Sequence, residues 1–402
     1  MKSNQYPESI GQSPADTAPS LSLVATLSLG TFIIFFQGFM VAPVLPKLAF
    51  LFQVPVRHVS FIEPAYLLSY GIATLIYAPL SDKYGRLPVI IISLSGFIVL
   101  TALTAFSRSV NQMIIFRLLT GLSAGGVAPT TIGWIGDRFP YEKRGHALGV
   151  FFGFMAGGTA LGSSAGALLT AVTGWQMLFR IVALTGLLIL AVILANRKKI
   201  IQEKNKQQGS FCSMIAAFGN LVRLPRGRRT YLFVLFNSMF HSGIFAWTGY
   251  LFFKNYHLSE KGIGLALLGY GIPGLFLGPF LGRLADKFGR NRIIPIGICL
   301  GASSAIMLSM SLPLAASCIF IASLSLGFDM THPLFAAIIT TLSNQKGVAI
   351  GLFAFVMFMG YGLGSLVFSL MISFGLNESF KIFGTAAVLA AILSVFAFKH
   401  ER

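Results

Sequence analysis

Charged side chains are scarce in this chain. Asp, Glu, Lys and Arg make up 10% of its 402 residues, whereas a typical soluble domain has about 25%. Hydrophobic residues account for 55%, and the mean hydropathy is +0.78. This composition excludes an ordinary water-soluble fold, because too few polar side chains remain to cover its surface. The sequence therefore predicts a membrane protein.

Cysteines and catalytic motifs are also scarce. Of the three cysteines, Cys299 and Cys318 lie in apolar runs and Cys212 lies in a polar segment, so none is placed for an extracellular disulfide. The sequence contains no His-Glu-x-x-His metal motif and no Gly-x-x-x-x-Gly-Lys phosphate loop. We therefore expect no enzyme activity, no bound metal, no cofactor and no pumping driven by ATP.

Long apolar runs dominate the rest of the chain. A run of about 20 apolar residues crosses the hydrocarbon core of a bilayer as a helix. The sequence predicts twelve such spans, at residues 22–46, 61–80, 88–107, 112–136, 146–171, 177–196, 230–253, 262–285, 292–311, 313–341, 347–373 and 379–398.

The excess of basic residues is unevenly distributed over the loops. Lys and Arg number 30 against 12 acidic residues, and most of them lie in the loops on the same side as the two termini. This asymmetry follows the positive-inside rule and excludes nucleic acid as the reason for the charge. We expect a multi-pass protein of the plasma membrane, the inner membrane of a bacterium, with both termini in the cytoplasm. Its expected partners are the lipid bilayer, protons and a small-molecule substrate, with no nucleic acid, and we expect a monomer.

The two halves of the sequence repeat one another. DKYGR at 82–86 is followed by DKFGR at 286–290, and further matches follow at nearly the same offset. The chain therefore divides into a disordered tail (1–20), a six-helix bundle (21–196), a cytoplasmic linker (197–229) and a second six-helix bundle (230–402). The apolar patch FCSMIAAFGNLV in the linker predicts a helix on the membrane surface.

Both copies of the repeated turn carry a known pattern. Gly-x-x-x-Asp-Lys-x-Gly-Arg-x-Arg at 282–292 resembles the loop signature of the major facilitator superfamily, and MIIFRLLTGLSAGG at 113–126 resembles a signature of its drug:proton antiporter branch. The resemblance implies an all-α membrane protein with twelve transmembrane helices in two pseudo-symmetric six-helix bundles. It also implies a gate at the cytoplasmic end, formed by Asp82, Gly85, Arg86, Asp137, Gly282, Asp286, Gly289 and Arg290.

The two copies of this gate differ in composition. Asp137, at the end of the fourth span, is placed to join Asp82 and Arg86, whereas Thr341 occupies the equivalent position of the second half. We therefore expect the two ionic latches to differ in strength.

Arg117 lies inside the fourth span. A central arginine costs about 2.5–3.5 kcal/mol on insertion scales, so its presence needs a reason. One interpretation is an arginine that snorkels outward or binds helix backbone. The other places Arg117 in the translocation path, where it moves protons or holds an anionic group of the substrate.

Asp329 and His332 stand three residues apart in the tenth span, on one helical face. A carboxyl group and an imidazole in such a place are suited to binding and releasing a proton. The alternative is that they bind backbone groups freed by Pro333 and hold a kink. Glu63, at the start of the second span, is interpreted as a first-turn acid favoured by the helix dipole.

The resemblance further implies that spans one, four, seven and ten line a central cavity. The polar or amphipathic side chains there that are candidate substrate contacts are Gln37, Asn237, His241 and Trp247. The alternative for a lone Asn or Gln is a hydrogen bond that joins neighbouring helices. With 38 phenylalanines in the chain, the cavity is expected to be largely apolar and to suit lipophilic or aromatic compounds.

We predict a proton-coupled secondary transporter that exports a small, largely apolar organic compound by alternating access. The fifth span lacks the Gly-Pro pair common in exporters of the antiporter type, and reads GGTALG at 157–162 instead. The alternative therefore stays open that the protein is a proton symporter importing a nutrient, siderophore or other metabolite.

Overall fold

The structure is helical throughout the part of the chain that it describes. This computed structural model describes residues 20–139, 141–201, 211–270, 284, 287–310, 312–342 and 346–401. The first half contains α1 (Leu21–Phe39), η1 (Ala42–Val44), α2 (Leu45–Phe52), α3 (Val56–Val59), α4 (Ile62–Tyr84), α5 (Arg86–Thr104), α6 (Val110–Ala124), α7 (Val127–Arg138), α8 (Tyr141–Thr173) and α9 (Trp175–Ala195). The linker and second half contain α10 (Arg197–Ile200), α11 (Phe211–Arg223), α12 (Pro225–Tyr256), α13 (Glu260–Ala266), α15 (Arg290–Leu308), α16 (Leu314–Thr340), α17 (Lys346–Met371), η2 (Ile372–Phe374) and α18 (Leu376–Ala397).

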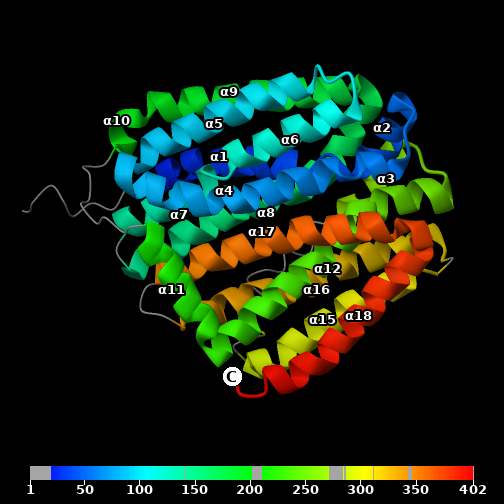
Figure 1. Ribbon diagram of the computed structural model, residues 1–402. Helices are drawn as coiled ribbons and strands as arrows, with labels where there is room; N and C mark the ends of the chain where they lie inside the picture. The colour runs from blue at the N-terminus through cyan, green and yellow to red at the C-terminus, as the bar shows by residue number, and fades with distance from the viewer. Residues whose placement is uncertain are drawn as a thin grey trace, which may run out of the picture.

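The predicted spans agree with these helices. Ten segments of the described chain are long and apolar enough to cross a membrane, and each corresponds to one predicted span. The seventh span forms the 32-residue helix α12, which is less apolar because it carries residues such as Asn237 and His241. Most of the eighth span, like Gly282 and Asp286 of the predicted gate, lies outside the described residues. The protein is an all-α membrane protein of two six-helix bundles (Figure 1).

Glycines set the close packing within the first bundle. A Cβ at Gly121 or Gly125 of α6 would collide with the backbone carbonyl of Tyr66 or Tyr70 in α4. A Cβ at Gly158 or Gly162 of α8 would meet the backbone of α1 in the same way. Because helices without side chains at the contact approach closely, α4–α6 and α1–α8 form tight pairs. The four-residue spacing of Gly121 and Gly125 puts both glycines on the face of α6 that contacts α4.

The fourth span is broken, which the sequence analysis did not predict. Helix α6 ends at Ala124 and α7 begins at Val127, with Gly125 and Gly126 between them. Pro129 has no N–H to donate to the carbonyl four residues earlier, that of Gly125, so the helical ladder is interrupted at this point.

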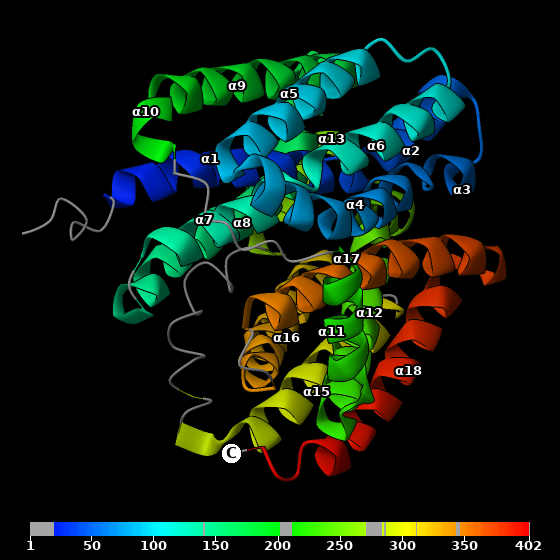
Figure 2. The ribbon, with the colours of Figure 1, turned by 60° about the vertical axis from the view of Figure 1, so that its left-hand side comes forward.

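The two bundles contact one another unevenly along their length. We call the end that carries Arg86, Asp137 and Arg290 the basic end, and the end that carries η1, α3 and η2 the far end. Helices α4 and α17 lie side by side between the bundles (Figures 1 and 2), where Gly71 of α4 packs on Phe358 of α17. At the far end, Lys47 Nζ forms an ion pair with Glu260 Oε1 at 3.0 Å.

Two further contacts join the bundles toward the far end. Gly249 of α12 lies against the backbone of Pro43 in η1, and Gly264 of α13 lies against Ser164 and Leu168 of α8. Toward the basic end the ribbons of the two bundles diverge (Figure 2). The far end is therefore the closed end of this conformation.

Helix α11 forms in the linker, where the sequence predicted a surface helix. Its residues Phe218 and Leu221 are buried. Helix α10 begins the linker and docks on α7, where Trp134 Nε1 donates to the Ile200 carbonyl at 3.0 Å.

Glu401 ties together three segments of the second half at the basic end. Its carboxylate accepts from Arg226 Nε at 2.7 Å and Nη2 at 2.6 Å and also from Arg229, while its carbonyl accepts from the Asn291 N–H at 2.8 Å. The hydrogen bond from Arg226 is the main cause that lowers the pKa of Glu401 below its ordinary value of 4.5. The folded state therefore holds the charged carboxylate more tightly than the unfolded chain does.

We expect Glu401→Gln to lower the free energy of unfolding by about 1–2 kcal/mol at pH 7, since charge-assisted hydrogen bonds are lost but Arg226 is partly exposed to solvent. The stabilisation is complete above pH 4.5, the unfolded value, and is lost as the pH falls through the lowered folded value. Thermal unfolding of the detergent-solubilised protein at pH 7 and near pH 4 measures this, with Glu378→Gln as the exposed control. If Glu401→Gln lowers the free energy of unfolding equally at pH 7 and near pH 4, the charged carboxylate of Glu401 is not the source of the stabilisation.

Candidate functional site

Arg117 is fully buried in α6 and bonds to the end of α1. Its Nη1 donates to Gln37 Oε1 at 2.5 Å and to the Gln37 carbonyl at 3.3 Å, and its Nη2 donates to the Gly38 carbonyl at 3.3 Å. Its Nε donates to the Ile62 carbonyl at 3.5 Å. The guanidinium also lies 4.1 Å from the centre of the Tyr66 ring. The structure thus brings together two residues that the sequence analysis named separately, Arg117 and Gln37.

The position of Arg117 has a physical explanation. The last carbonyls of a helix have no partner within that helix, and a cation is favoured there by the helix dipole. The Gln37 and Gly38 carbonyls are such groups, because α1 ends at Phe39. Arg117 therefore binds helix backbone, as one of the two interpretations of its charge requires. Its part in transport stays a prediction.

Glu63 lies beside this arginine, and the sequence analysis did not assign it to the site. It is in the first turn of α4, as expected, but it is 0% exposed, and both carboxyl oxygens are without a hydrogen-bond partner among the described residues. Arg117 is within electrostatic reach, and Ser365 of α17 lies against the carboxyl group from the second bundle. Sequence could not find this contact, because it depends on the packing of the two bundles.

In the second bundle, two histidines lie on either side of one phenylalanine. The Phe328 ring stacks on His241 with the centroids 4.0 Å apart and on His332 with the centroids 4.8 Å apart. The Tyr270 hydroxyl is hydrogen-bonded to His241 Nε2. The Nδ1 atoms of both histidines are buried without a hydrogen-bond partner within the described ranges. His241 of α12 and His332 of α16 therefore belong to one aromatic cluster.

The other candidates of the second bundle are distributed around this cluster. Asp329 accepts a hydrogen bond from Ser325 Oγ at 3.2 Å, one turn earlier in α16. Asn237 donates to Thr331 Oγ1 at 3.0 Å, which joins α12 to α16. Trp247 lies apart, fully buried against Phe368, with a ring distance of 5.7 Å.

An aromatic layer crosses the contact between the bundles. Tyr70 of α4 lies 4.3 Å from the Phe358 ring of α17, and Phe39 of α1 lies 5.8 Å from Phe245 of α12 and 6.1 Å from Tyr361 of α17. These rings close the middle of the molecule toward the far end.

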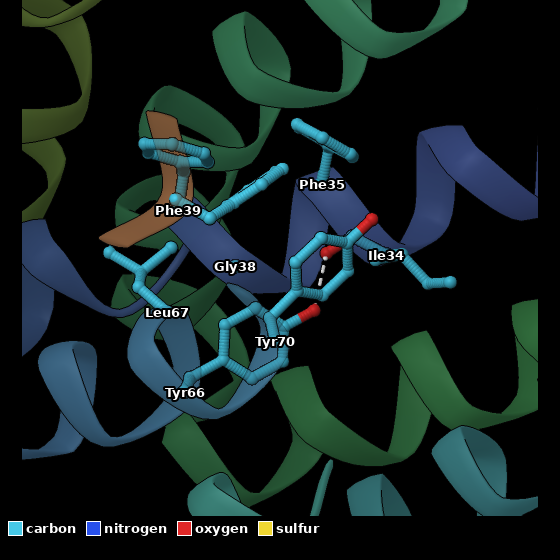
Figure 3. A pocket seen from close by; sticks show the side chains of 8 residues that line it. Ile34, Phe35, Gly38, Phe39, Tyr66, Leu67 and Tyr70 are labelled. Atoms are coloured by element: carbon cyan, nitrogen blue, oxygen red, sulfur yellow. Dashed lines mark hydrogen bonds between the residues drawn. The ribbon is translucent and has the colours of Figure 1, made fainter. Parts of the chain in front are cut away.

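A small hollow lies beside this layer, between α1 and α4. Figure 3 shows Tyr66 and Tyr70 facing Phe35, Gly38 and Phe39 around it, with the Tyr66 hydroxyl donating to the Ile34 carbonyl at 3.1 Å. Its volume of about 10 Å³ is close to what one water molecule needs. The hollow is therefore too small to hold an organic substrate in this conformation.

Arg86 joins three polar groups at the basic end of the first bundle. Its Nη1 lies 2.6 Å from Asp82 Oδ1 and 2.5 Å from Ser81 Oγ, and its Nε lies 3.0 Å from Asp137 Oδ2. Gly133 of α7 leaves room for the guanidinium, since a Cβ there would lie 2.9 Å from its central carbon. The structure thus brings together the three ionic members of the predicted first gate.

The turns of both gate copies need glycine. Gly85 has φ +98° and Gly289 has φ +85°, a region that residues with a Cβ rarely adopt. Gly85 joins α4 to α5, and Gly289 directly precedes Arg290 at the start of α15. The remaining members of the second copy, Gly282 and Asp286, are outside the described residues.

The comparisons with known proteins agree with this architecture. The family model of the Major Facilitator Superfamily matches residues 27–253 and 230–402, which together span nearly the whole chain. The chain belongs to the Major Facilitator Superfamily. Proteins of this superfamily are membrane carriers and not enzymes.

Two similar superfamily members come from the bacterium Bacillus subtilis. The uncharacterized transporter YwfA of Bacillus subtilis is 27% identical over 94% of this chain and 92% of its own length. Multidrug resistance protein 3 of Bacillus subtilis is 29% identical, over 43% of this chain and 34% of its own length. The crystal structure of a D-xylose-proton symporter matches with a TM-score of 0.76 and 17% identity over 93% of this chain and 96% of that chain, which shows the shared fold.

Replacing Arg86 tests the gate of this superfamily member. A lysine places one point charge where arginine presents a fork to two carboxylates, so we expect Arg86→Lys to reduce the initial transport rate about fivefold, the effect of about 1 kcal/mol on an equilibrium. Stability should change by less than about 1 kcal/mol, because the ion pairs are partly exposed. Transport rates and thermal unfolding measure the two effects, and Lys83→Arg in the same loop is the control. Unchanged transport would contradict a gating role.

Proposed function

We propose that this protein is a proton-coupled carrier that exports a small, largely apolar organic compound by alternating access. The observation that carries the proposal is the cluster of Asp329, His241 and His332 among aromatic rings at the middle of the molecule. Such a site offers an apolar surface for an organic compound together with groups that bind protons. The two bundles would rock about it, opening at the basic end and the far end in turn.

Export is favoured over import by the printed names of relatives. Multidrug resistance protein 3 matches 43% of this chain, and a tetracenomycin C resistance and export protein of Streptomyces glaucescens is 27% identical over 46% of this chain and 35% of its own length. In this proposal the basic end faces the cytoplasm of a bacterium, since basic loops are retained on that side. The chain would then lie in the inner membrane, with both termini in the cytoplasm, and act as a monomer without a cofactor.

One observation keeps a proton symporter as the second candidate. Exporters of the antiporter type carry a Gly-Pro pair in the fifth span, but α8 has glycines without proline, and Gly158 and Gly162 pack on the backbone of α1. In that case the same site would take up a nutrient, siderophore or other metabolite together with a proton.

Transport in inverted membrane vesicles separates these candidates. The basic end then faces the medium, and the lumen is acidified by one pH unit. An exporter coupled to protons accumulates the lipophilic probes ethidium and rhodamine 6G in the lumen, whereas a symporter releases a preloaded substrate from it. Probe uptake that is the same with and without the pH gradient would contradict proton coupling.

A further inference from the structure

Glu63 is a buried acidic side chain within the predicted spans that the proposed function does not use. It stands at the start of α4, near the far end, where α4 packs against α17 of the other bundle. The side chain is 0% exposed, and in the part of the chain that the structure describes neither carboxyl oxygen has a hydrogen-bond partner. A polar group in such surroundings costs free energy, and a charged carboxylate costs far more than a neutral carboxylic acid.

The neighbours of Glu63 do not stabilise a charge by direct contact. Arg117 of α6 is the nearby cation, but its donors are directed to Gln37, Gly38 and Ile62, and it forms no ion pair with Glu63 in the described part of the chain. Ser365 faces the carboxyl group from α17, but the two groups do not meet in hydrogen-bonding geometry.

Two tyrosines complete the titratable surroundings of Glu63. Tyr66, one turn later in α4, holds its ring against the Arg117 guanidinium. The Tyr270 hydroxyl of the second bundle is within electrostatic reach of Glu63 and also of Asp329, and it is hydrogen-bonded to His241. Neither tyrosine is hydrogen-bonded to the Glu63 carboxyl group.

We propose that Glu63 is a proton-binding site whose occupation permits the far end to close. When α4 and α17 separate at the far end, the carboxyl group meets water and ionises. When they come together, the same group loses that water and gains no hydrogen bond. Closure therefore favours the protonated form, and by linkage a proton bound at Glu63 favours closure.

This inference rests on the proposed function for its opening and closing of the far end, and it assigns a residue to that step. If one proton is linked to closure, the ratio of closed to open molecules changes at most about tenfold per pH unit. In the proposed orientation the proton enters from the side opposite the cytoplasm. Asp329 and Glu63 would then be two separate proton sites, one in each bundle.

The test measures the distance between the bundles at the far end as a function of pH. Spin labels at Arg57→Cys, in α3, and Ser373→Cys, in η2, report this distance by pulsed electron paramagnetic resonance in nanodiscs between pH 5.5 and 8.5. The native cysteines are replaced by serine. We expect the short distance to gain population as the pH falls in the parent protein, and to dominate at every pH in Glu63→Gln. Glu63→Asp keeps a carboxyl group and should keep a pH-dependent distance.

A matched control removes the partly exposed carboxylate of Glu260, which pairs with Lys47 at the same end of the molecule. Burial raises the pKa of Glu260, but the hydrogen bond and charge of Lys47 outweigh it and leave the pKa below its ordinary value of 4.5. Glu260 therefore does not titrate between pH 5.5 and 8.5, and Glu260→Gln should keep the parent's pH-dependent shift. The proposal is overturned if Glu63→Gln keeps that shift, or if Glu63→Asp loses it while remaining folded.

The result is separable from the proposed function. The distance measurement needs no substrate, so a pH-dependent far end that is lost in Glu63→Gln supports the inference even if the vesicles show no proton-driven transport. Conversely, if transport is driven by protons but Glu63→Gln keeps the pH-dependent distance at the far end, this inference alone is refuted.

Discussion

Asp329→Asn is expected to abolish proton-driven accumulation while leaving downhill movement of the same probe. A proton that moves down a gradient of one pH unit supplies about 1.4 kcal/mol, enough for about a tenfold concentration ratio. The parent protein should therefore accumulate ethidium about tenfold in acidified inverted vesicles, and the variant about as much as vesicles without a gradient. The reason is that an amide in place of the Asp329 carboxyl group has the same shape but binds no proton.

Two controls make this result specific. Glu378→Gln removes an exposed carboxylate of α18 whose ion pair with Lys381 is long, at 3.9 Å, and it should behave as the parent. Exchange of labelled probe across vesicles at equal pH reports whether Asp329→Asn still binds and moves substrate. If the variant keeps the full accumulation ratio, Asp329 does not carry the proton. The carboxyl group would then act through its hydrogen bond with Ser325.

Arg117→Gln is expected to lower the free energy of unfolding by about 3–5 kcal/mol, the usual cost of removing one partner from a buried charged network. The guanidinium donates to three carbonyls and to the Gln37 side chain, and one amide cannot replace these bonds. Thermal unfolding in detergent measures the loss, and transport should fall with it. The free energy of unfolding of Arg117→Lys should lie between those of the parent protein and Arg117→Gln, since a single ammonium reaches fewer acceptors than a guanidinium does.

Arg108→Gln is the matched control for this change, because Arg108 is exposed at the start of α6. We expect it to alter stability by no more than about 0.5 kcal/mol. A small effect of Arg117→Gln, comparable to that of Arg108→Gln, would mean that the buried network does not support the end of α1.

The helices themselves were predictable from sequence, because crossing a bilayer requires long apolar runs whatever the tertiary packing is. The first gate was predictable for a different reason. Asp82 and Arg86 are four residues apart in a motif that the chain repeats, and Asp137 stands at the end of the fourth span. The glycine faces of α6 followed from spacing alone. The break at Gly125 and Gly126 was missed because the apolar run continues through it.

The site depends on contacts that no local pattern encodes. From sequence, Glu63 is an ordinary first-turn acid, and only the packing of α17 on α4 shows that it is buried. His241 and His332 are on different helices, and it is the Phe328 ring that places them in one stack. Gln37 and Arg117 were each identified as polar residues in apolar spans. Their hydrogen bond could not be predicted, because the sequence does not show where the end of α1 lies relative to α6. Trp247 was grouped with the cavity residues by its span, whereas its ring packs on Phe368.

Cross-linking the far end tests the central claim, that transport requires the two bundles to separate there. Lys47→Cys and Glu260→Cys replace the ion pair of 3.0 Å between the bundles, in a protein whose native cysteines are serine. A bifunctional methanethiosulfonate reagent then joins the two positions. We predict that cross-linked protein in proteoliposomes stops transporting, and that a reductant restores the rate. A cross-link between Glu378→Cys and Lys381→Cys, within α18, should have no effect. Full transport by molecules shown to be completely cross-linked at the far end would contradict the account.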